Sequence, residues 1–586
     1  MQAYFFLLGF LPFVNVARLN PVPSFWVQWV VFFVAAVFTV HLIWLNRARQ
    51  QERAAVSLLA LSLIALSVIL LGQVSQGVVA SKINALFAVV ILLVGACLHH
   101  AVRLAFQEVK KERLLSWWSK GVAVALACQM LAATLLWCGI AWVPFHIFNV
   151  GVPPRMFGTF GQPNQFGVFV ALALSVLLYL TRRQILKEPA LFIGWVMAAV
   201  LCAASGSRAA ICTWLVLALS NLAQEFKCRG RVDLPPMSHG WRLAGLHVLF
   251  AVIQFMWAIG LVAMAGVNGV ATRVMSDSGG IAARLEQYRD SFALFLDHPI
   301  SGYGFENFAK SRVYQLSGSL LEPQSTHTHN LLTNALIDYG LLGGVFVVAA
   351  CIWVVFGAFQ VIFKDDGKNE ELNLVAVWSL GLLGYAFLEY PFQYIHFFFT
   401  FLLITAFLPG WSFKFDRKNT SILRGARLFF LMGAISMSVW VAIDYRRLQN
   451  LVLDLEDQVG EFGKVKRPPS LAELTRLRQE SLFVRYVDNY WLKSLGLSAD
   501  IADIKIEVAK SLFEEIPAGD TLAWYAVQLI SGQRDDDALA LMCNFGRRNG
   551  SEFDVALENM RKFSRTFAPA NRFLEVNQGQ LSKRCR

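Results

Sequence analysis

Long apolar runs separated by short polar loops are the dominant pattern of the chain. About 20 consecutive apolar residues cross a bilayer as an α-helix, so runs of roughly 17–25 such residues predict membrane spans. We therefore expect an all-α polytopic membrane protein with about thirteen transmembrane helices. The predicted spans are 1–17, 25–45, 54–72, 83–100, 119–141, 165–181, 189–204, 207–223, 243–265, 331–362, 370–390, 393–410 and 423–443.

The first of these runs has no basic stretch before it and no convincing small-residue cleavage site, so we interpret it as a membrane helix and not a removable signal. Composition supports the membrane assignment, because 56% of the residues are hydrophobic and only 16% are charged. These values exclude a soluble enzyme, a disordered chain and a secreted disulfide scaffold.

The net charge of +12 indicates topology and not a nucleic-acid partner. Alternate loops from 46–53 to 412–427 hold 22 Lys and Arg, whereas the short loops on the other face hold four. Because cytoplasmic loops keep positive charge, the N-terminus is expected in the cytoplasm of a bacterial inner membrane, and an odd number of spans exports the C-terminus to the periplasm.

Two large segments then lie on the exported side of a membrane domain covering 1–443: a loop at about 267–329 and a tail at 444–586. Pro468-Pro469, Gly496, Pro517-Ala518-Gly519 and Gly532 divide the tail into expected helical hairpins, which are either tetratricopeptide-like or another small helical domain. Cys543 and Cys585 both lie in this tail, and we hypothesise that they form a disulfide if the compartment is oxidising.

The unusual polar clusters all fall on the exported face. A cytoplasmic site is disfavoured, because the basic loops opposite contain neither a Gly-rich phosphate cradle nor paired carboxylates. The exported clusters are Gly161-Gln162-Pro163-Asn164-Gln165-Phe166-Gly167, Ser207-Arg208, Arg284 with Tyr288, Gly302-Tyr303-Gly304, Thr326-His327-Thr328-His329-Asn330 and Leu388-Glu389-Tyr390-Pro391.

Each cluster also has a structural explanation. Gln162 and Asn164 would serve equally as helix caps and turn residues, and Arg208 alone would snorkel to the membrane edge. Beside Arg284, however, Arg208 offers a second guanidinium on the same face, and two guanidiniums can clamp a phosphate or pyrophosphate.

The two histidines do not predict a metal site. Side chains two residues apart on an extended segment are expected to point apart, and no Asp, Glu or Cys set near His327 and His329 completes a ligand sphere. His329 is either a structural residue at a helix entrance or a base.

Glu389 is costly to desolvate at a membrane boundary unless it has a partner, for which Arg208, Arg284 or a protonated His329 are available. A purely structural ion pair is the alternative to a catalytic role.

One chemistry uses all these groups. Two arginines stabilise the pyrophosphate that leaves a lipid-linked sugar, and a neutral histidine takes a proton from an attacking hydroxyl. No metal or other cofactor is required, so the residues predict metal-independent glycosyl transfer from a polyprenyl-pyrophosphate donor.

At the quoted motifs the sequence resembles the O-antigen ligase and polymerase superfamily, most closely the bacterial O-linked protein oligosaccharyltransferases that glycosylate pilins. The resemblance implies a multi-pass glycosyltransferase that moves an oligosaccharide en bloc from undecaprenyl pyrophosphate to a Ser or Thr of a pilin-like periplasmic protein. It implies His329, and not His327, as the essential histidine, Arg208 and Arg284 as pyrophosphate ligands, and Gln162 with Asn164 as the loop amides. Glu389 and Tyr390 match the Glu-Tyr-Pro signature of the protein-glycosylating branch, and His327 lies beside them in the expected substrate site.

Two alternatives remain open. An O-antigen ligase acting on lipid A core, or an O-antigen polymerase, would use the same Arg208, Arg284 and His329. A lipid or solute transporter is disfavoured, because transporters place charges near the midplane between repeated halves, and we detect no internal repeat.

Overall fold

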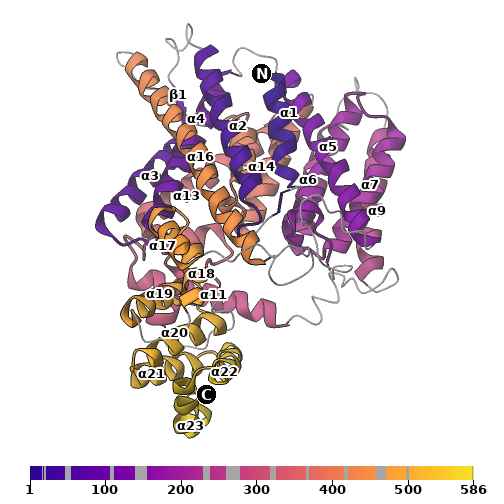
Figure 1. Cartoon of the computed structure of the whole chain (residues 1–586). Helices are drawn as coiled ribbons and strands as arrows, with labels where there is room; N and C mark the ends of the chain where they lie inside the picture. The colour runs from indigo at the N-terminus through magenta and orange to yellow at the C-terminus, as the bar shows by residue number, and fades with distance from the viewer. Residues whose placement is uncertain are drawn as a thin grey trace.

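The computed structural model describes residues 1–15, 17–18, 21–45, 55–105, 111–138, 155–228, 238–258, 278–316, 325–364, 369–414, 420–456, 470–495, 501–583 and 585. The start of the predicted large loop (267–277), Pro468-Pro469 and Gly496 lie outside these residues. Figure 1 shows a bundle of long helices with a smaller group of helices, α19 to α23, at one end.

The first part of the bundle follows the predicted hydrophobic pattern. Its helices are α1 (Gln2–Phe10), η1 (Leu11–Phe13), α2 (Phe25–Leu45), α3 (Leu58–Gln76), α4 (Lys82–Ala105), α5 (Lys111–Trp137), α6 (Pro163–Arg182), α7 (Glu188–Ser205), α8 (Arg208–Cys228) and α9 (Ser238–Ala258).

The second part contains the helices that complete the bundle and the segment between them. They are α11 (Ser278–Asp297), α12 (Phe308–Gln315), α13 (Leu331–Lys364), α14 (Glu370–Leu388), η4 (Pro391–Gln393), α15 (Ile395–Thr405) and α16 (Thr420–Glu456). The sequence did not predict one feature, a short antiparallel pair in which β1 (Ala55–Ser57) joins β2 (Ser412–Lys414).

The protein is nearly all-helical and multi-pass. Each of the thirteen predicted spans overlaps a helix, and nine described helices are long and apolar enough to cross a membrane. Three further apolar helices in the described residues, Gln2–Phe13, Arg242–Trp257 and Ile395–Thr405, are shorter. The count of thirteen spans therefore stays a prediction.

Helix α6 is the most enclosed of the candidate spans, with 89% of its apolar window buried against 22% for α16. It packs on α5, α7, α8 and α14. Within the membrane region, Trp378 of α14 donates to Ser175 of α6 (3.0 Å), which satisfies both polar atoms where water is absent. The buried position of α6 fixes the place of its first turn, which carries Asn164.

Helix α13 is broken at Gly340, where φ is 61° and ψ is −157°. The Gly302-Tyr303-Gly304 segment packs against this break: Tyr303 donates its backbone N–H to Ile337 (2.7 Å), and Leu341 donates to Pro299 (2.8 Å). A Cβ on Gly302 would lie 2.4 Å from the Ile337 carbonyl oxygen. This glycine motif therefore holds α13 to the segment that follows α11.

The tail continues directly from α16, since that helix runs past residue 443 to Glu456. Its packed pairs of helices agree with the predicted hairpins, and the breaks predicted at Pro517-Ala518-Gly519 and Gly532 separate α19 from α20 and α20 from α21. The predicted disulfide between Cys543 and Cys585 is present. The tail helices are α17 (Leu471–Glu480), α18 (Val484–Leu495), α19 (Ala502–Glu515), α20 (Gly519–Ser531), α21 (Asp535–Gly546), α22 (Gly550–Ser564) and α23 (Ala568–Lys583).

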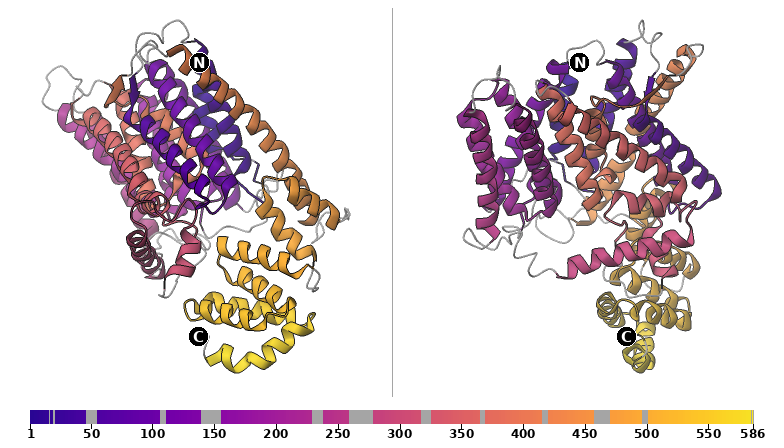
Figure 2. Two further views of the ribbon diagram at one scale, coloured as in Figure 1. Left: turned by 90° about the vertical axis from the view of Figure 1, so that its left-hand side faces the viewer. Right: turned by 180° about the vertical axis from the view of Figure 1, so that it is seen from behind.

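The tail docks on α12, between the bundle and the tail helices. Arg548 donates to the backbone carbonyls of Arg312 (2.7 Å) and Val313, two of the last carbonyls of α12, which have no partner within the helix. Lys310 pairs with Glu514 of α19 (2.8 Å). Both views in Figure 2, from the side and from behind, also place the tail at the end of the bundle opposite the N-terminus.

We expect Arg548→Ala to loosen this contact, because charged donors to carbonyls contribute about 1.5–3 kcal/mol each. Amides of α12 should exchange with deuterium faster in the variant. Arg547→Ala is the matched control, since Arg547 is the exposed neighbour of Arg548. Unchanged exchange in α12 would show that Arg548 does not hold the tail.

Candidate active site

Glu389 occupies the turn that ends α14. Pro391 disfavours helical backbone at the residue before it, and Glu389 itself is extended (φ −146°, ψ −171°). The chain then enters η4, so Glu389 lies in the turn between the two helices and not within α14. Its side chain is 15% exposed, which makes hydrogen-bonding partners necessary.

Three residues predicted for the site contact this carboxylate. Asn164 donates from Nδ2 to Oε1 (3.0 Å), and Arg284 donates from Nη2 to the same oxygen (2.9 Å). His329 Nδ1 lies 2.8 Å from Oε2. The structure thus brings together residues from α6, α11, the entrance of α13 and the end of α14.

The contact with Glu389 assigns the tautomer of His329. An ionised carboxylate only accepts hydrogen bonds, so Nδ1 carries the proton. In the neutral imidazole Nε2 then holds the lone pair and is the basic atom. This arrangement lets the ring take a proton at Nε2 while Glu389 orients it.

Asn330 fixes His329 relative to Glu389. Its Oδ1 accepts from the backbone N–H groups of Leu332 (3.0 Å) and Thr333 (3.3 Å), which caps α13. Its Nδ2 donates to the Phe387 carbonyl (2.9 Å) in the last turn of α14. One side chain therefore ties the start of α13 to the end of α14.

The expectation that the two histidines point apart is wrong. His329 has a left-handed backbone (φ 55°), which turns its ring back until the centroids of His327 and His329 lie 4.1 Å apart. The N–H of His329 donates to Nδ1 of His327 (3.3 Å). Burial lowers the pKa of His327 to about 4, so this ring is neutral near pH 7 and can accept that bond.

Tyr390 also lies next to His327, with the centroids of the two rings 5.6 Å apart. Burial raises the pKa of its hydroxyl above the usual value, so the group is a neutral phenol at physiological pH. His327 and Tyr390 together form an uncharged aromatic wall beside the charged Glu389 cluster.

The two terminal nitrogens of the Arg284 guanidinium differ in their hydrogen bonding. Nη2 bonds Glu389, whereas Nη1 is buried with no hydrogen-bond partner among the described residues. A buried donor without a partner is rare and costly, and an incoming anionic oxygen would satisfy it. Nη1 is therefore a candidate atom for binding an anion.

Arg155 belongs to the same network and was not predicted as a site residue. It donates from Nη2 to Oδ1 of Asn164 (2.9 Å) and from Nε to the Ser205 carbonyl (2.8 Å). Hydrogen bonds therefore connect Arg155 to Asn164 and Asn164 to Glu389. The signal that could have found it was its place among the four basic residues expected on the exported face.

Arg208 and Gln162 lie at the two helix starts next to this network. Arg208 is the exposed first residue of α8, and the carbonyl of Gly206 just before it accepts from Arg155 (3.4 Å). Gln162 caps α6, since its Oε1 accepts from the N–H of Gln165 (2.6 Å). The capping interpretation is correct for this oxygen, while Nε2 has no partner among the described residues.

Within the described residues, no group of three or more His, Cys, Asp and Glu is placed to hold a metal ion. Metal independence stays a prediction.

Residues 192–348, which include Arg208, Arg284 and His329, match the model of the O-antigen ligase family. This segment of the chain is similar to O-antigen ligases. Asn164 and Glu389 lie outside the matched segment, one before it and one after it in the sequence, and both belong to the charged cluster. Residues 380–545 match a family described as virulence factor membrane-bound polymerase, C-terminal.

Two curated proteins are similar to a longer part of the chain than the O-antigen ligase match covers. The general O-oligosaccharyltransferase of Acinetobacter baylyi is 24% identical over 308 residues, covering 49% of this chain and 48% of that protein. The ComP-specific O-oligosaccharyltransferase of the same organism is 21% identical over 282 residues, covering 47% of each. The chain spans about half the length of these relatives, and the resemblance inferred from the motifs is confirmed.

Proposed function

We propose that the protein is an O-oligosaccharyltransferase that moves a whole oligosaccharide from undecaprenyl pyrophosphate to a Ser or Thr of a pilin-like protein. The buried, unpartnered Nη1 of Arg284 beside the Glu389–His329 pair carries the proposal, because it places an anion-binding donor next to a base. The proposed location is the bacterial inner membrane, with the N-terminus in the cytoplasm and the site and tail in the periplasm.

In this mechanism the arginines hold the leaving group. Arg284 Nη1 and Arg208 donate to the pyrophosphate, on which negative charge grows as its bond to the anomeric carbon breaks. Arg155 and Asn164 keep the Glu389 side of the site in place. Glu389 in turn accepts from Arg284, so the guanidinium stays oriented before the donor arrives.

His329 activates the acceptor. Its Nε2 takes the hydroxyl proton as the acceptor oxygen forms a bond to the anomeric carbon, and Glu389 stabilises the imidazolium through Nδ1. The pyrophosphate departs with the electrons of the broken bond. A single displacement of this kind inverts the anomeric centre.

Gln162→Ser separates capping from substrate contact. Serine is a good N-cap, so α6 should keep its stability, whereas the free Nε2 is lost. We expect the efficiency of donor use to fall about tenfold, as for a hydrogen bond to a charged group. Donor kinetics and thermal unfolding measure the two effects, with Gln162→Asn as the control that keeps both an oxygen and an amide. Full activity in the serine variant would show that Gln162 only caps α6 and does not contact the donor.

The function is tested by offering two acceptors in competition. The purified protein is reconstituted with a lipid-linked oligosaccharide, a pilin-like protein and lipid A core, and each acceptor is weighed by mass spectrometry. Glycan on the protein supports the proposal, and glycan on lipid A core makes the protein a ligase.

The polymerase family matched by residues 380–545 defines the remaining candidate. A polymerase would extend the donor itself, and lipid-linked chains of two or more repeat units would appear without either acceptor. Uptake of the lipid without any bond breaking would indicate a transporter.

A further inference from the structure

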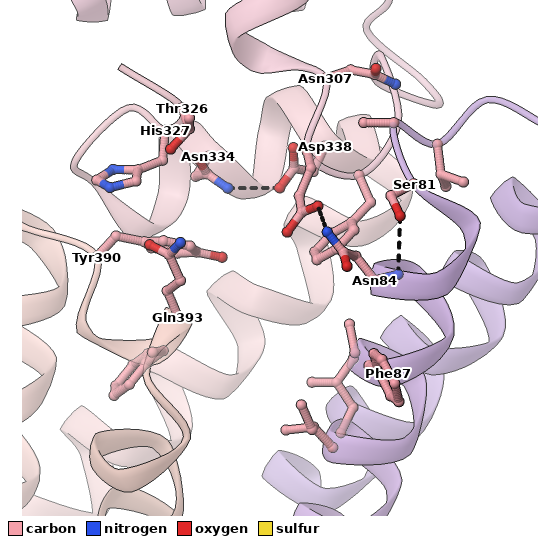
Figure 3. A pocket seen from close by; sticks show the side chains of 18 of the residues that line it. Ser81, Asn84, Phe87, Asn307, Thr326, His327, Asn334, Asp338, Tyr390 and Gln393 are labelled. Atoms are coloured by element: carbon pink, nitrogen blue, oxygen red, sulfur yellow. Dashed lines mark hydrogen bonds between the residues drawn. The ribbon is translucent and has the colours of Figure 1, made fainter. Parts of the chain in front are cut away.

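A cavity of about 1360 Å³ lies between the membrane helices and the tail. It is larger than most small-molecule pockets, which occupy roughly 300–1,000 Å³. It reaches the candidate active site through His327 and Tyr390, and Figure 3 shows both residues at one side of it, with Asn84 and Phe87 across from them. Residues of α18 and α19 also line it.

The lining of the cavity changes along its length. Leu63 of α3, Ile91 of α4 and Phe398 of α15 belong to the part made by apolar bundle helices. Lys310 of α12 and Glu514 of α19 belong to the part made with the tail. An occupant must therefore have an apolar portion and a polar portion.

The charges of the cavity disfavour the pyrophosphate. Its three described cations are all in ion pairs, Lys310 and Lys510 with Glu514 and Arg485 with Glu515. Among the described residues, the lining carboxylates of Glu306 and Asp338 have no ion-pair partner. Nη1 of Arg284, the atom proposed to bind the donor pyrophosphate, is not part of this lining. The donor phosphates and the cavity are therefore assigned to different sides of the site.

Glu306 is held in place by an unusual backbone. Its φ is 62°, a left-handed conformation that is rare for a non-glycine residue and often marks a functional position. Its Oε2 accepts from Nδ2 of Asn84 at the start of α4 (2.9 Å). The carboxylate is exposed, so a cation in the cavity can reach it.

We propose that this cavity is the entrance for the acceptor polypeptide, and that Glu306 selects acceptors with a basic side chain next to the modified Ser or Thr. This inference rests on the proposed function and names the acceptor class of the same site. The acceptor's apolar segment lies among α3, α4 and α15, and its hydroxyl reaches His329 past His327.

Electrostatic complementarity distinguishes this occupant from the others. A polyprenyl chain gains nothing from an exposed carboxylate, and a neutral glycan would be insensitive to its charge. A basic peptide segment gains from it, and complementary charge of this kind governs the choice of partner more than raw affinity.

The test uses the full protein in nanodiscs with a lipid-linked oligosaccharide and the acceptor protein found by the competition assay. The acceptor is made in three forms, with Lys, Gln or Glu beside the modified residue. The wild type should prefer Lys over Gln and Gln over Glu. Glu306→Gln should raise the KM for the Lys form about two- to fivefold, as expected for an exposed ion pair. Glu306→Lys should reverse the preference.

Asp503→Lys is the matched control, because Asp503 is exposed on α19 and is not part of the lining. Donor KM should stay unchanged in all three variants. Asp503→Lys should keep the wild-type order. The inference is overturned if acceptor charge has no effect, if Glu306→Lys keeps the wild-type order, or if the Glu306 variants alter donor KM instead. If the wild type modifies no protein at all, the proposed function fails and this inference fails with it.

Discussion

His329→Ala is expected to reduce transfer by a factor of about 10²–10⁴, the usual contribution of a positioned general base. The loss follows from the geometry, because Nδ1 is held by Glu389 at 2.8 Å and Nε2 is the atom left to take a proton. Initial rates of transfer in reconstituted membranes measure the effect. Expression and membrane insertion should be normal.

His298→Ala is the control for this variant. His298 is an exposed histidine next to α11 and is outside the Glu389 cluster. Its substitution should leave the rate unchanged. Retained transfer in His329→Ala would reject the base assignment and favour a structural role at the entrance of α13.

Arg284→Ala should lower the efficiency of donor use about a hundredfold, as expected for removal of a charged donor from a developing anion. The effect should appear in the donor parameters and not in the acceptor KM, since Nη1 is the atom assigned to the pyrophosphate. Arg208→Ala should act in the same direction. Steady-state kinetics with each substrate varied in turn separate an effect on donor use from an effect on acceptor binding.

Arg289→Ala is the matched control for Arg284→Ala. Arg289 lies on the same helix, is 67% exposed and pairs with Asp290 at 3.5 Å. It should keep wild-type donor kinetics. An effect of Arg284→Ala confined to acceptor affinity would contradict the clamp.

Hydropathy predicted the membrane helices well because burial in lipid demands long apolar segments that satisfy their own backbone. It could not predict the break in α13, since Gly340 resembles any other glycine of an apolar run. That break depends on contacts with Gly302 and Pro299, which are distant in sequence. The β1–β2 pair and the capping of α12 by Arg548 depend on tertiary contacts in the same way.

The site was predicted from residue chemistry, and its errors came from backbone geometry. Glu389 needed partners at a membrane boundary, and the structure supplies Arg284 and His329, two of the three expected, together with Asn164. The edge-to-face contact between the rings of His327 and His329 was missed because a positive φ at a histidine has no sequence signature. Arg155 was missed because one arginine in a short loop is ordinary.

The central claim is that the Glu389 cluster transfers a complete oligosaccharide to protein in one displacement. The most direct measurement is the intact mass of the acceptor protein after incubation with a donor of defined length. We predict a single mass increment equal to the whole oligosaccharide, with release of one polyprenyl pyrophosphate for each transfer. A series of increments of one sugar each, or a mass change on the lipid alone, would contradict the account.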